Sequence, residues 1–319
     1  MTLLYADKIF VEHDTGPMHP ECPERAVRIW KRLTHKGLDN RCQKQAIALA
    51  TKDQVLSVHS PAVFSFAEQT CHEGGGYLDG DTPVSSHSLE VALYAAGTGI
   101  AAVDAVMEDK DNNAFCLVRP PGHHATPSRS MGFCLFNNIA IAAKHAITKY
   151  ELNRVLIVDW DVHHGNGTQD VFYADPQVMF FSAHRFPFYP GSGRISETGT
   201  QHGLGYTVNL PVRYGTSRHE YQSGFLSMLE KAAEKIRPEL VLISAGFDAH
   251  ALDPVGSLGL ESEDFGELSR LVLQVADVHA SGRCVSMLEG GYHLEALAEG
   301  VEIHLRELLA ASKHVPSGT

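Results

Sequence analysis

Four short segments of the sequence combine histidine, aspartate and glycine in patterns that could hold a metal ion and move protons. They read R-P-P-G-H-H-A from residue 119, D-W-D-V-H-H-G-N-G-T from 159, S-A-G-F-D-A-H from 244 and E-G-G-Y-H from 289. Each segment directly follows a short apolar run of the kind that forms a buried strand. Ligands of open α/β sheets bind outside the carboxyl ends of the strands, so we expect the four segments to converge on one crevice.

The second segment offers metal ligands at alternate positions. If the chain stays extended past Val158, the side chains of Asp159, Asp161 and His163 point to one side. A catalytic zinc site needs three protein ligands and an open position for water, and Asp248 in the third segment can supply another ligand. Two carboxylates and one neutral imidazole would leave a Zn²⁺ site formally neutral. Taken alone, the same residues could also form a polar loop or a salt-bridge cluster.

The first and fourth segments carry side chains suited to proton transfer. His123 and His124 follow a rigid Pro-Pro-Gly turn, and an unperturbed imidazole has a pKa of about 6.5, close to neutral pH. Their far nitrogens need partners, for which Asp159 and Asn166 are available. The glycines before Tyr292 would let that loop approach the metal, so that the phenol could donate to an oxygen that gains negative charge.

The elements that must position these segments alternate along the chain. Most of the apolar runs lack polar alternation, which is typical of strands buried on both faces of a parallel sheet. The predicted strands cover residues 3–5, 47–49, 114–118, 155–158, 178–181, 206–209, 240–243 and 284–288, and the predicted helices cover 23–36, 88–108, 137–150, 218–236, 261–279 and 294–312. This pattern predicts a three-layer α/β fold with a mainly parallel central sheet of about eight strands flanked by helices.

Composition limits the class of protein. The 319 residues include 26 Lys and Arg against 38 Asp and Glu, a net charge of −12, with 44% hydrophobic residues, as in soluble globular proteins. The acidic balance argues against nucleic-acid and anionic-membrane binding, which need a basic patch, and fits a cationic substrate. With no linker or repeat in the sequence, we expect a single domain over residues 1–319, with a short polar tail at 313–319. Oligomers are compatible with this pattern.

The sequence also predicts a cytoplasmic protein without a membrane partner. The most apolar long stretch, residues 89–107, is interrupted by Glu90 and Asp104, which indicates a buried helix rather than a membrane span. The first residues lack the basic leader and long apolar core of a secretory signal. The six cysteines lie far apart and form no C-x-x-C pair, as expected for reduced thiols.

Together these residues resemble a known family, the zinc-dependent histone deacetylases and acetylpolyamine amidohydrolases. The resemblance runs from His19 to about Tyr292, and the four segments occur in the family's order together with G-F-C-L-F-N-N from residue 132. The opening H-P-E-C-P-E-R and the asparagine at position 166 resemble the class II branch and its bacterial relatives. The resemblance implies the arginase/deacetylase-like α/β fold.

The resemblance also implies roles for individual residues. His124 matches the family's main general base and acid, with His123 supporting it electrostatically, and Tyr292 matches the tyrosine that polarises the scissile carbonyl. The chemistry implied is hydrolysis by a metal-activated water, without a covalent intermediate. The implied catalytic residues are His123, His124, Asp159, Asn166 and Tyr292, and the implied zinc ligands are Asp161, His163 and Asp248.

Further positions match the family's substrate and cation sites. Phe133 and Tyr189 would wall a tunnel for the lysine-like chain, and Asp81 lies where relatives have an acid that touches the substrate backbone. The implied substrate-binding set is Asp81, Gly132, Phe133, Tyr189 and Gly291. For structural K⁺ or Na⁺, the resemblance implies one site at Asp159, Asp161, His163, Ser182 and Ala183, and a second at Phe172, Asp175, Val178 and Tyr206.

We therefore expect a zinc-dependent hydrolase that removes acetyl or other acyl groups from lysine side chains or lysine-like amines. Acetylated polyamines or other small amides are the alternative substrates. An arginase-like ureohydrolase would need carboxylates four residues after Asp161 and two after Asp248, where the chain has Gly165 and His250. An inactive acyl-lysine binding module is a further alternative, which the intact ligand set and Tyr292 oppose.

Overall fold

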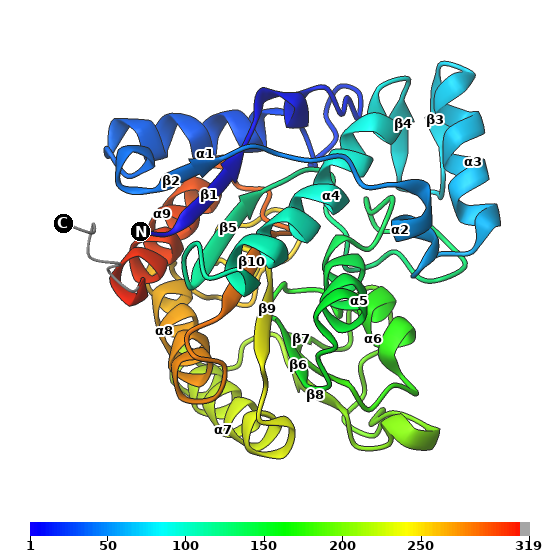
Figure 1. Cartoon of the computed structure of the whole chain (residues 1–319). Coiled ribbons are helices and arrows are strands. Elements are labelled where there is room, and N and C mark those ends of the chain that lie inside the picture. The colour runs from blue at the N-terminus through cyan, green and yellow to red at the C-terminus, as the bar shows by residue number, and fades with distance from the viewer. Residues whose placement is uncertain (313–319) are drawn as a thin grey trace.

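The central feature of the computed structural model, which describes residues 1–312, is one sheet of eight strands (Figure 1). In order across the sheet, the strands are β2 (Gln43–Gln45), β1 (Leu3–Ala6), β5 (Asn113–Leu117), β10 (Cys284–Leu288), β9 (Leu240–Ala245), β6 (Val155–Asp159), β7 (Val178–Arg185) and β8 (Thr207–Val212). All neighbouring pairs in this sheet are parallel. The expected parallel sheet of about eight strands is confirmed.

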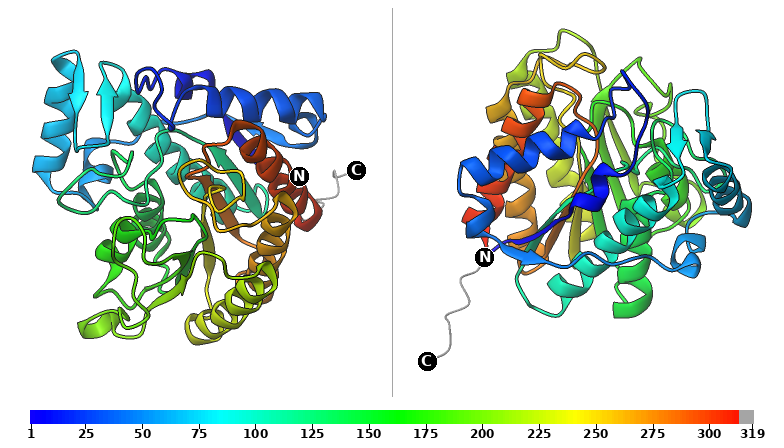
Figure 2. Two further views of the ribbon diagram at one scale, coloured as in Figure 1. Left: turned by 180° about the vertical axis from the view of Figure 1, so that it is seen from behind. Right: turned by 90° about the horizontal axis from the view of Figure 1, so that it is seen from above.

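Helices cover both faces of the sheet, as the right panel of Figure 2 shows from above. One layer contains α2 (Lys52–Leu56), α3 (Pro61–His72), α4 (Ser88–Met107), α5 (Asn138–Tyr150) and α6 (Asn166–Phe172), and the other contains α1 (Glu24–His35), α7 (Arg218–Ile236), α8 (Ser262–His279) and α9 (Leu294–Ala311). Short 3₁₀ turns lie at Lys8–Val11, Asp39–Arg41 and Gln201–Gly203, and β3 (Gly75–Tyr77) pairs antiparallel with β4 (Pro83–Ser85). Each layer packs its own apolar core against one face of the sheet.

Local chemistry explains where several of these elements begin. Asn137 caps α5 by accepting a hydrogen bond from the Ala140 N–H, and Ser217 caps α7 in the same way through the Glu220 N–H. Among residues 1–312, α4 is the one helix long and apolar enough to cross a membrane by length and composition, but 67% of its most apolar window is buried inside the protein. It therefore packs as a core helix, as its interrupted apolar sequence predicts.

One predicted strand, at residues 47–49, is wrong. Strand β2 lies just before it, at Gln43–Gln45, and pairs with β1 alone, so this edge strand tolerates polar side chains. The apolar run instead crosses α4, where the Ala50 N–H donates to the Leu93 carbonyl at 2.9 Å. Helices α2, α3 and α6 and the β3–β4 pair were not predicted, and the expected tail at 313–319 lies outside the described residues.

The strand order places the chemistry at the middle of the sheet. Strands β5, β10, β9 and β6 are consecutive neighbours, and each is followed by one of the four polar segments. Because all four strands run parallel, their carboxyl ends meet at one edge. The expected convergence of these segments is therefore what the fold produces.

Candidate metal centre and active site

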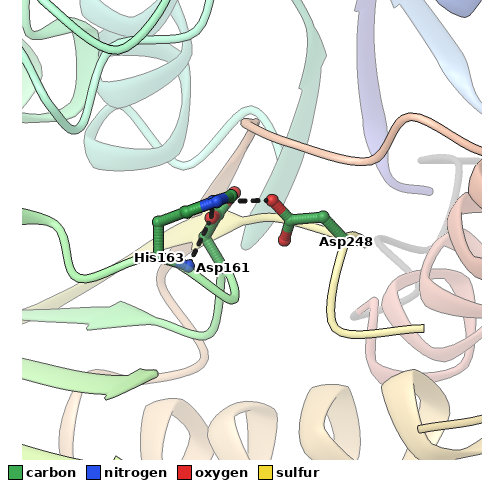
Figure 3. A group of neighbouring side chains, drawn as sticks. All are labelled: Asp161, His163 and Asp248. Atoms are coloured by element: carbon green, nitrogen blue, oxygen red, sulfur yellow. Dashed lines mark hydrogen bonds and ion pairs between the residues drawn. The ribbon is translucent and has the colours of Figure 1, made fainter. Parts of the chain in front are cut away.

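Asp161, His163 and Asp248 lie together at this edge, with their side chains pointing toward one another (Figure 3). Asp161 and His163 follow β6, and Asp248 follows β9. His163 Nδ1 lies 3.0 Å from Asp161 Oδ1 and 3.0 Å from Asp248 Oδ2. One potential ligand atom from each residue lies within 4.8 Å of the others. The three predicted ligands therefore form a compact donor group, in which all three side chains are buried.

Several features of this group fit a divalent cation. Asp248 Oδ2 is buried and, apart from the 3.0 Å contact with His163 Nδ1, has no polar partner that satisfies it, and burial followed by the charge of Asp161 raises the pKa of Asp248 to about 7. Two closely packed buried carboxylates repel each other, and a cation would relieve this repulsion. A Cβ atom on Gly290 would lie 2.4 Å from Asp248 Oδ2 and 2.5 Å from Asp161 Oδ2, so glycine leaves the carboxylates room. Oxygen and imidazole donors of this kind suit Zn²⁺.

Side chains continue to alternate in direction after β6 ends at Asp159, and this alternation positions the donor group. Trp160 and Val162 point into the apolar core between the sheet and α7, α8 and α9, whereas Asp161 and His163 turn toward the site. Backbone N–H groups hold the carboxylates, since the Gly290 N–H donates to Asp161 Oδ2 at 2.8 Å and the Val162 N–H donates to Asp248 Oδ1 at the same distance. Backbone hydrogen bonds thus help to fix the position of the donor group.

The two adjacent histidines have different partners. His123 Nδ1 lies 2.9 Å from Asp159 Oδ2, and His124 Nδ1 lies 2.7 Å from Asn166 Oδ1. Because both partner atoms are acceptors, each Nδ1 carries a proton, which leaves Nε2 of His124 as the position that can accept one. The ring centroids of the two histidines are 4.0 Å apart. Both pairings predicted from the sequence are therefore present.

The electrostatic surroundings separate the two histidines further. Burial alone would lower the pKa of His123, but the charges of Asp159 and Asp161 outweigh it and hold the pKa well above its ordinary value. Burial, and then the nearby charges of His123 and His163, lower the pKa of His124 well below its ordinary value. At neutral pH the pair thus combines a protonated His123 with a neutral His124.

A narrow pocket of about 160 Å³ leads to these groups. The ring centroids of Phe133 and Tyr292 are 5.8 Å apart in an edge-to-face arrangement, and Tyr189 stands edge-on to His124 at 5.2 Å. The pocket is lined by Asp81, His124, Gly132, Phe133, His163, Phe188, Tyr189, Val255 and Tyr292. An aromatic slot that reaches a general base and a metal ligand suits an unbranched aliphatic chain with a polar end.

Tyr292 can act as a hydrogen-bond donor in this pocket. Burial, and then the charges of Asp248 and Asp161, raise the pKa of its phenol well above the ordinary value. The phenol therefore keeps its proton at neutral pH and can offer it to an oxygen that becomes negative.

The predicted substrate residues fall into two groups. Asp81, Gly132, Phe133 and Tyr189 all line the pocket, and Asp81 Oδ1 accepts the Gly132 N–H at 3.2 Å. Gly291 is not among the lining residues, and its carbonyl accepts a hydrogen bond from Arg25 Nε at 2.6 Å. A direct contact between Gly291 and a substrate stays a prediction.

The predicted monovalent-cation ligands lie close to one another in the fold, and cation binding there stays a prediction. For the first site, Ser182 is the cross-strand partner of Asp159 in the β6–β7 register. For the second, the Asp175 N–H donates to the Phe172 carbonyl at 3.0 Å, while the Asp175 carboxylate pairs with Lys144 at 2.7 Å.

Sequence reasoning missed Glu289, which holds the histidine loop. Its Oε2 accepts the N–H groups of Gly122 at 2.7 Å and His123 at 3.2 Å, and its Oε1 accepts the Ser244 hydroxyl at 3.0 Å. Burial raises the pKa of Glu289 to about 7, although the charge of His123 partly opposes this. A signal was available, because Glu289 directly follows a buried strand in a segment already singled out.

A second missed group is a buried charge cluster beneath the site. Glu21 Oε1 accepts hydrogen bonds from Arg119 Nε at 2.6 Å and from the Arg25 guanidinium at 2.8 Å, and all three residues are 0% exposed. Burial alone would raise the pKa of Glu21, but the two guanidinium groups lower it to about 2. Since Arg25 also binds the Gly291 carbonyl, the cluster ties residues 119–124 to residues 289–292.

Comparison with known proteins gives a consistent result. The histone deacetylase domain matches residues 19–308. A probable deacetylase of Archaeoglobus fulgidus is 39% identical over 291 residues, covering 90% of this chain and 80% of that protein. A histone deacetylase-like amidohydrolase of Pseudomonas aeruginosa is 38% identical over 286 residues, covering 89% of this chain and 75% of its own length.

Two further matches bear on structure and substrate. The human polyamine deacetylase HDAC10 is 41% identical over 309 residues, which covers 91% of this chain but 45% of that protein. The crystal structure of the HDA15 HD domain superimposes with a TM-score of 0.90 and 32% identity, over 97% of this chain and 88% of that chain. The sequence match and the fold therefore agree over most of the chain.

Proposed function

This chain belongs to the histone deacetylase family and is an amide-hydrolysing deacetylase, and we propose that it uses one Zn²⁺ ion to remove acetyl groups from lysine side chains of proteins or peptides. One observation carries this proposal. His124, the metal-ligand candidate His163 and Tyr292 all line the same narrow aromatic pocket. A lysine-like chain threaded into this slot would present its amide to a base, a metal site and a hydrogen-bond donor at once.

The metal would be held by Asp161, His163 and Asp248. The chemistry that a bound Zn²⁺ supplies is polarisation of the amide carbonyl and a lower pKa for an attacking water, from 15.7 toward about 7 in favourable sites. The rest of the reaction falls to the protein's own side chains.

His124 is placed to remove the proton from the attacking water. Its Nδ1 is committed to Asn166, so Nε2 is the nitrogen available to accept the proton. Tyr292 then donates to the carbonyl oxygen as negative charge develops there. Asp159 keeps the neighbouring His123 protonated, and a histidine of the pair returns a proton to the departing amine. The products are acetate and a free amine.

Acetylated polyamines are the second candidate substrates. The observation that favours them is the 41% identity to a human polyamine deacetylase. The net charge of −12 suits either cationic substrate and does not discriminate between them. Binding of K⁺ or Na⁺ at the two predicted sites and a cytoplasmic location are further proposals that rest on the sequence analysis.

The test compares kcat/KM for a panel of acylated lysine peptides with that for acetylspermidine and acetylputrescine, after loading with Zn²⁺ or Fe²⁺. We expect the zinc-loaded protein to turn over acetyl-lysine peptides with the higher kcat/KM, and arginine and agmatine to be inert. A higher kcat/KM for the acetylated polyamines would replace the proposed substrate class with the second candidate. Release of urea from arginine or agmatine would contradict deacetylase chemistry itself.

A further inference from the structure

Asp253 lies in the loop between β9 and α8, and its buried carboxylate binds the backbone of two loops. Its Oδ1 accepts the N–H groups of Val255 and Gly256, both at 2.9 Å. Its Oδ2 accepts the N–H groups of Tyr292 at 2.6 Å and His293 at 3.2 Å. The residue is 7% exposed. One carboxylate therefore satisfies four backbone donors, two on each side.

Both loops held in this way form walls of the pocket. Val255 and Tyr292 line it, yet neither is brought there by a strand or helix of its own. Asp253 itself is not among the lining residues. It can therefore influence a substrate only through the residues that it holds.

Both polar atoms of the peptide group between Gly291 and Tyr292 form hydrogen bonds with charged side chains. Its carbonyl oxygen accepts from Arg25 Nε at 2.6 Å, and its N–H donates to Asp253 Oδ2 at 2.6 Å. Gly291 has a φ of +125°, a region open to glycine, so its own backbone restricts this peptide group little. The orientation of the peptide group immediately before Tyr292 thus depends on these two charged side chains.

Asp253 lies at the N-terminal end of α9, where a negative charge is favourable. The two N–H groups bound by Oδ2 belong to the residues directly before α9, which begins at Leu294. A carboxylate at the N-terminus of a helix interacts favourably with the helix dipole. Hydrogen bonds to an ionised acceptor are also stronger than neutral ones. The carboxylate is therefore a firm attachment for the start of α9 and the tyrosine before it.

We propose that Asp253 is a positioning residue for Tyr292, keeping the phenol aimed at the reacting carbonyl by clamping the preceding peptide group. This inference rests on the deacetylase function proposed above. Misplacement of a reacting group by about 1 Å can cost roughly 10²-fold in rate. Loss of the clamp should therefore lower kcat although Asp253 touches no substrate.

The first test replaces Asp253 with asparagine. Its side-chain amide has one oxygen acceptor and one NH₂ group, so the NH₂ group must face one of the two pairs of backbone N–H donors and cannot accept from them. We expect Asp253→Asn to lower kcat at least about tenfold, with a smaller change in KM and full zinc content by elemental analysis. The matched control is Asp264→Asn. Asp264 is 2% exposed and also accepts a backbone N–H, that of Glu261 at 2.8 Å, but it does not line the pocket. This control should keep its kcat.

A double-mutant cycle with Tyr292→Phe separates positioning from general damage. If Asp253 acts through the phenol, adding Asp253→Asn to the Tyr292→Phe protein should lower kcat by less than about threefold, because there is no hydroxyl left to misplace. Losses that multiply in the double variant would overturn the proposal, and so would a native kcat in Asp253→Asn.

Amide hydrogen exchange of the metal-free protein gives a readout that needs no substrate. Asp253→Asn should speed exchange in the segment containing residues 292 and 293, and Asp264→Asn should not. Should Asp253→Asn fail to fold, Asp253→Ser takes its place, because its shorter side chain still offers an oxygen acceptor. Unchanged exchange at 292 and 293 would refute the clamp. If the unsubstituted protein turns over no acetylated substrate, the proposed function fails, while the exchange result still decides whether the clamp exists.

Discussion

The imidazole of His124 hydrogen-bonds the neutral amide of Asn166 at 2.7 Å, whereas the neighbouring His123 hydrogen-bonds the carboxylate of Asp159 at 2.9 Å. Two adjacent residues of the same type thus have partners of different charge, and only His123 has a carboxylate that offsets the effect of burial on its pKa. His124, which lines the pocket, has the neutral partner.

Replacing Asn166 with aspartate should shift the pH dependence of the enzyme. A carboxylate at this distance favours the protonated imidazole and raises the pKa of His124. The base must be neutral to accept a proton, so the acidic limb of the kcat/KM profile should move to higher pH. A profile of acetyl-lysine peptide hydrolysis across the neutral range measures the shift. A Tyr292→Phe control should lower the rate without moving the limb, and an unmoved limb in Asn166→Asp would contradict the role given to His124.

Replacing Tyr292 with phenylalanine removes one hydroxyl and almost no volume. The pocket should therefore keep its shape and the metal should stay bound, but the donor to the developing oxyanion is lost. Removing one such donor typically costs about 2.7–4 kcal/mol, or roughly 10²–10³ in kcat. Steady-state kinetics should show this loss mainly in kcat, with KM changed much less. A native kcat would mean that the phenol serves packing alone.

Metal content distinguishes ligands from proton carriers. Asp248→Ala removes one of three protein ligands, so we expect bound zinc and activity to disappear together. His124→Ala should keep its zinc and lose only turnover, because His124 is not in the donor group. Elemental analysis after dialysis against a low concentration of chelator measures both. Full zinc occupancy in Asp248→Ala would remove Asp248 from the ligand set.

Buried neutral histidines should make the protein sensitive to acid. His304 lies between Ser269 Oγ at 2.7 Å and Ser286 Oγ at 2.8 Å, and burial lowers its pKa from 6.5 to about 3. Between these values the unfolded chain binds more protons than the folded one. The stability from neutral His304 is thus fully present above pH 6.5 and is lost as the pH falls below it.

The variant His304→Gln has no titrating group at this position. Its pH slope can therefore be compared with that of the unsubstituted protein even if the two proteins differ in stability. The slope of the unfolding free energy against pH, taken between about 6 and about 4, should decrease by up to about 1.4 kcal/mol per pH unit. Denaturant unfolding at a series of pH values measures the slope in both proteins. Other histidines contribute to the slope that remains, because burial lowers the pKa of His13, His59 and His184 to about 4 and that of His164 to about 3. Identical slopes in the two proteins would exclude His304 as a source of acid sensitivity.

The sequence predicted strands best where a whole run of consecutive residues is apolar. Strands such as 240–243 and 284–288 could be predicted because a parallel strand covered on both faces must be apolar throughout. The same rule failed at 47–49, where an apolar run packs on α4 without joining the sheet, and at the polar strand Gln43–Gln45. Leu49 in the run at 47–49 is 49% exposed, so apolar character alone decided neither burial nor strand pairing there.

The site was predictable to the extent that its residues follow strands. The donor group and both histidine pairings come from segments at strand ends, where spacing and residue type are informative. Glu21 and Asp253 could not be found in this way. Charged residues are usually exposed, and what buries these two is a set of partners far away in the chain, such as Tyr292 for Asp253. Their roles depend on tertiary contacts, which a single sequence does not report.

The position of β10 has a consequence for protein synthesis. Strands β2, β1 and β5 lie on one side of it and β9, β6, β7 and β8 on the other, so β10 alone joins the two parts of the sheet. It is also the last strand among residues 1–312. On the ribosome, a nascent chain that has not yet exposed residues 284–288 lacks the strand that lies between β5, which precedes His123 and His124, and β9, which precedes Asp248. The enzyme therefore cannot become active during translation until its final strand has emerged and inserted between β5 and β9.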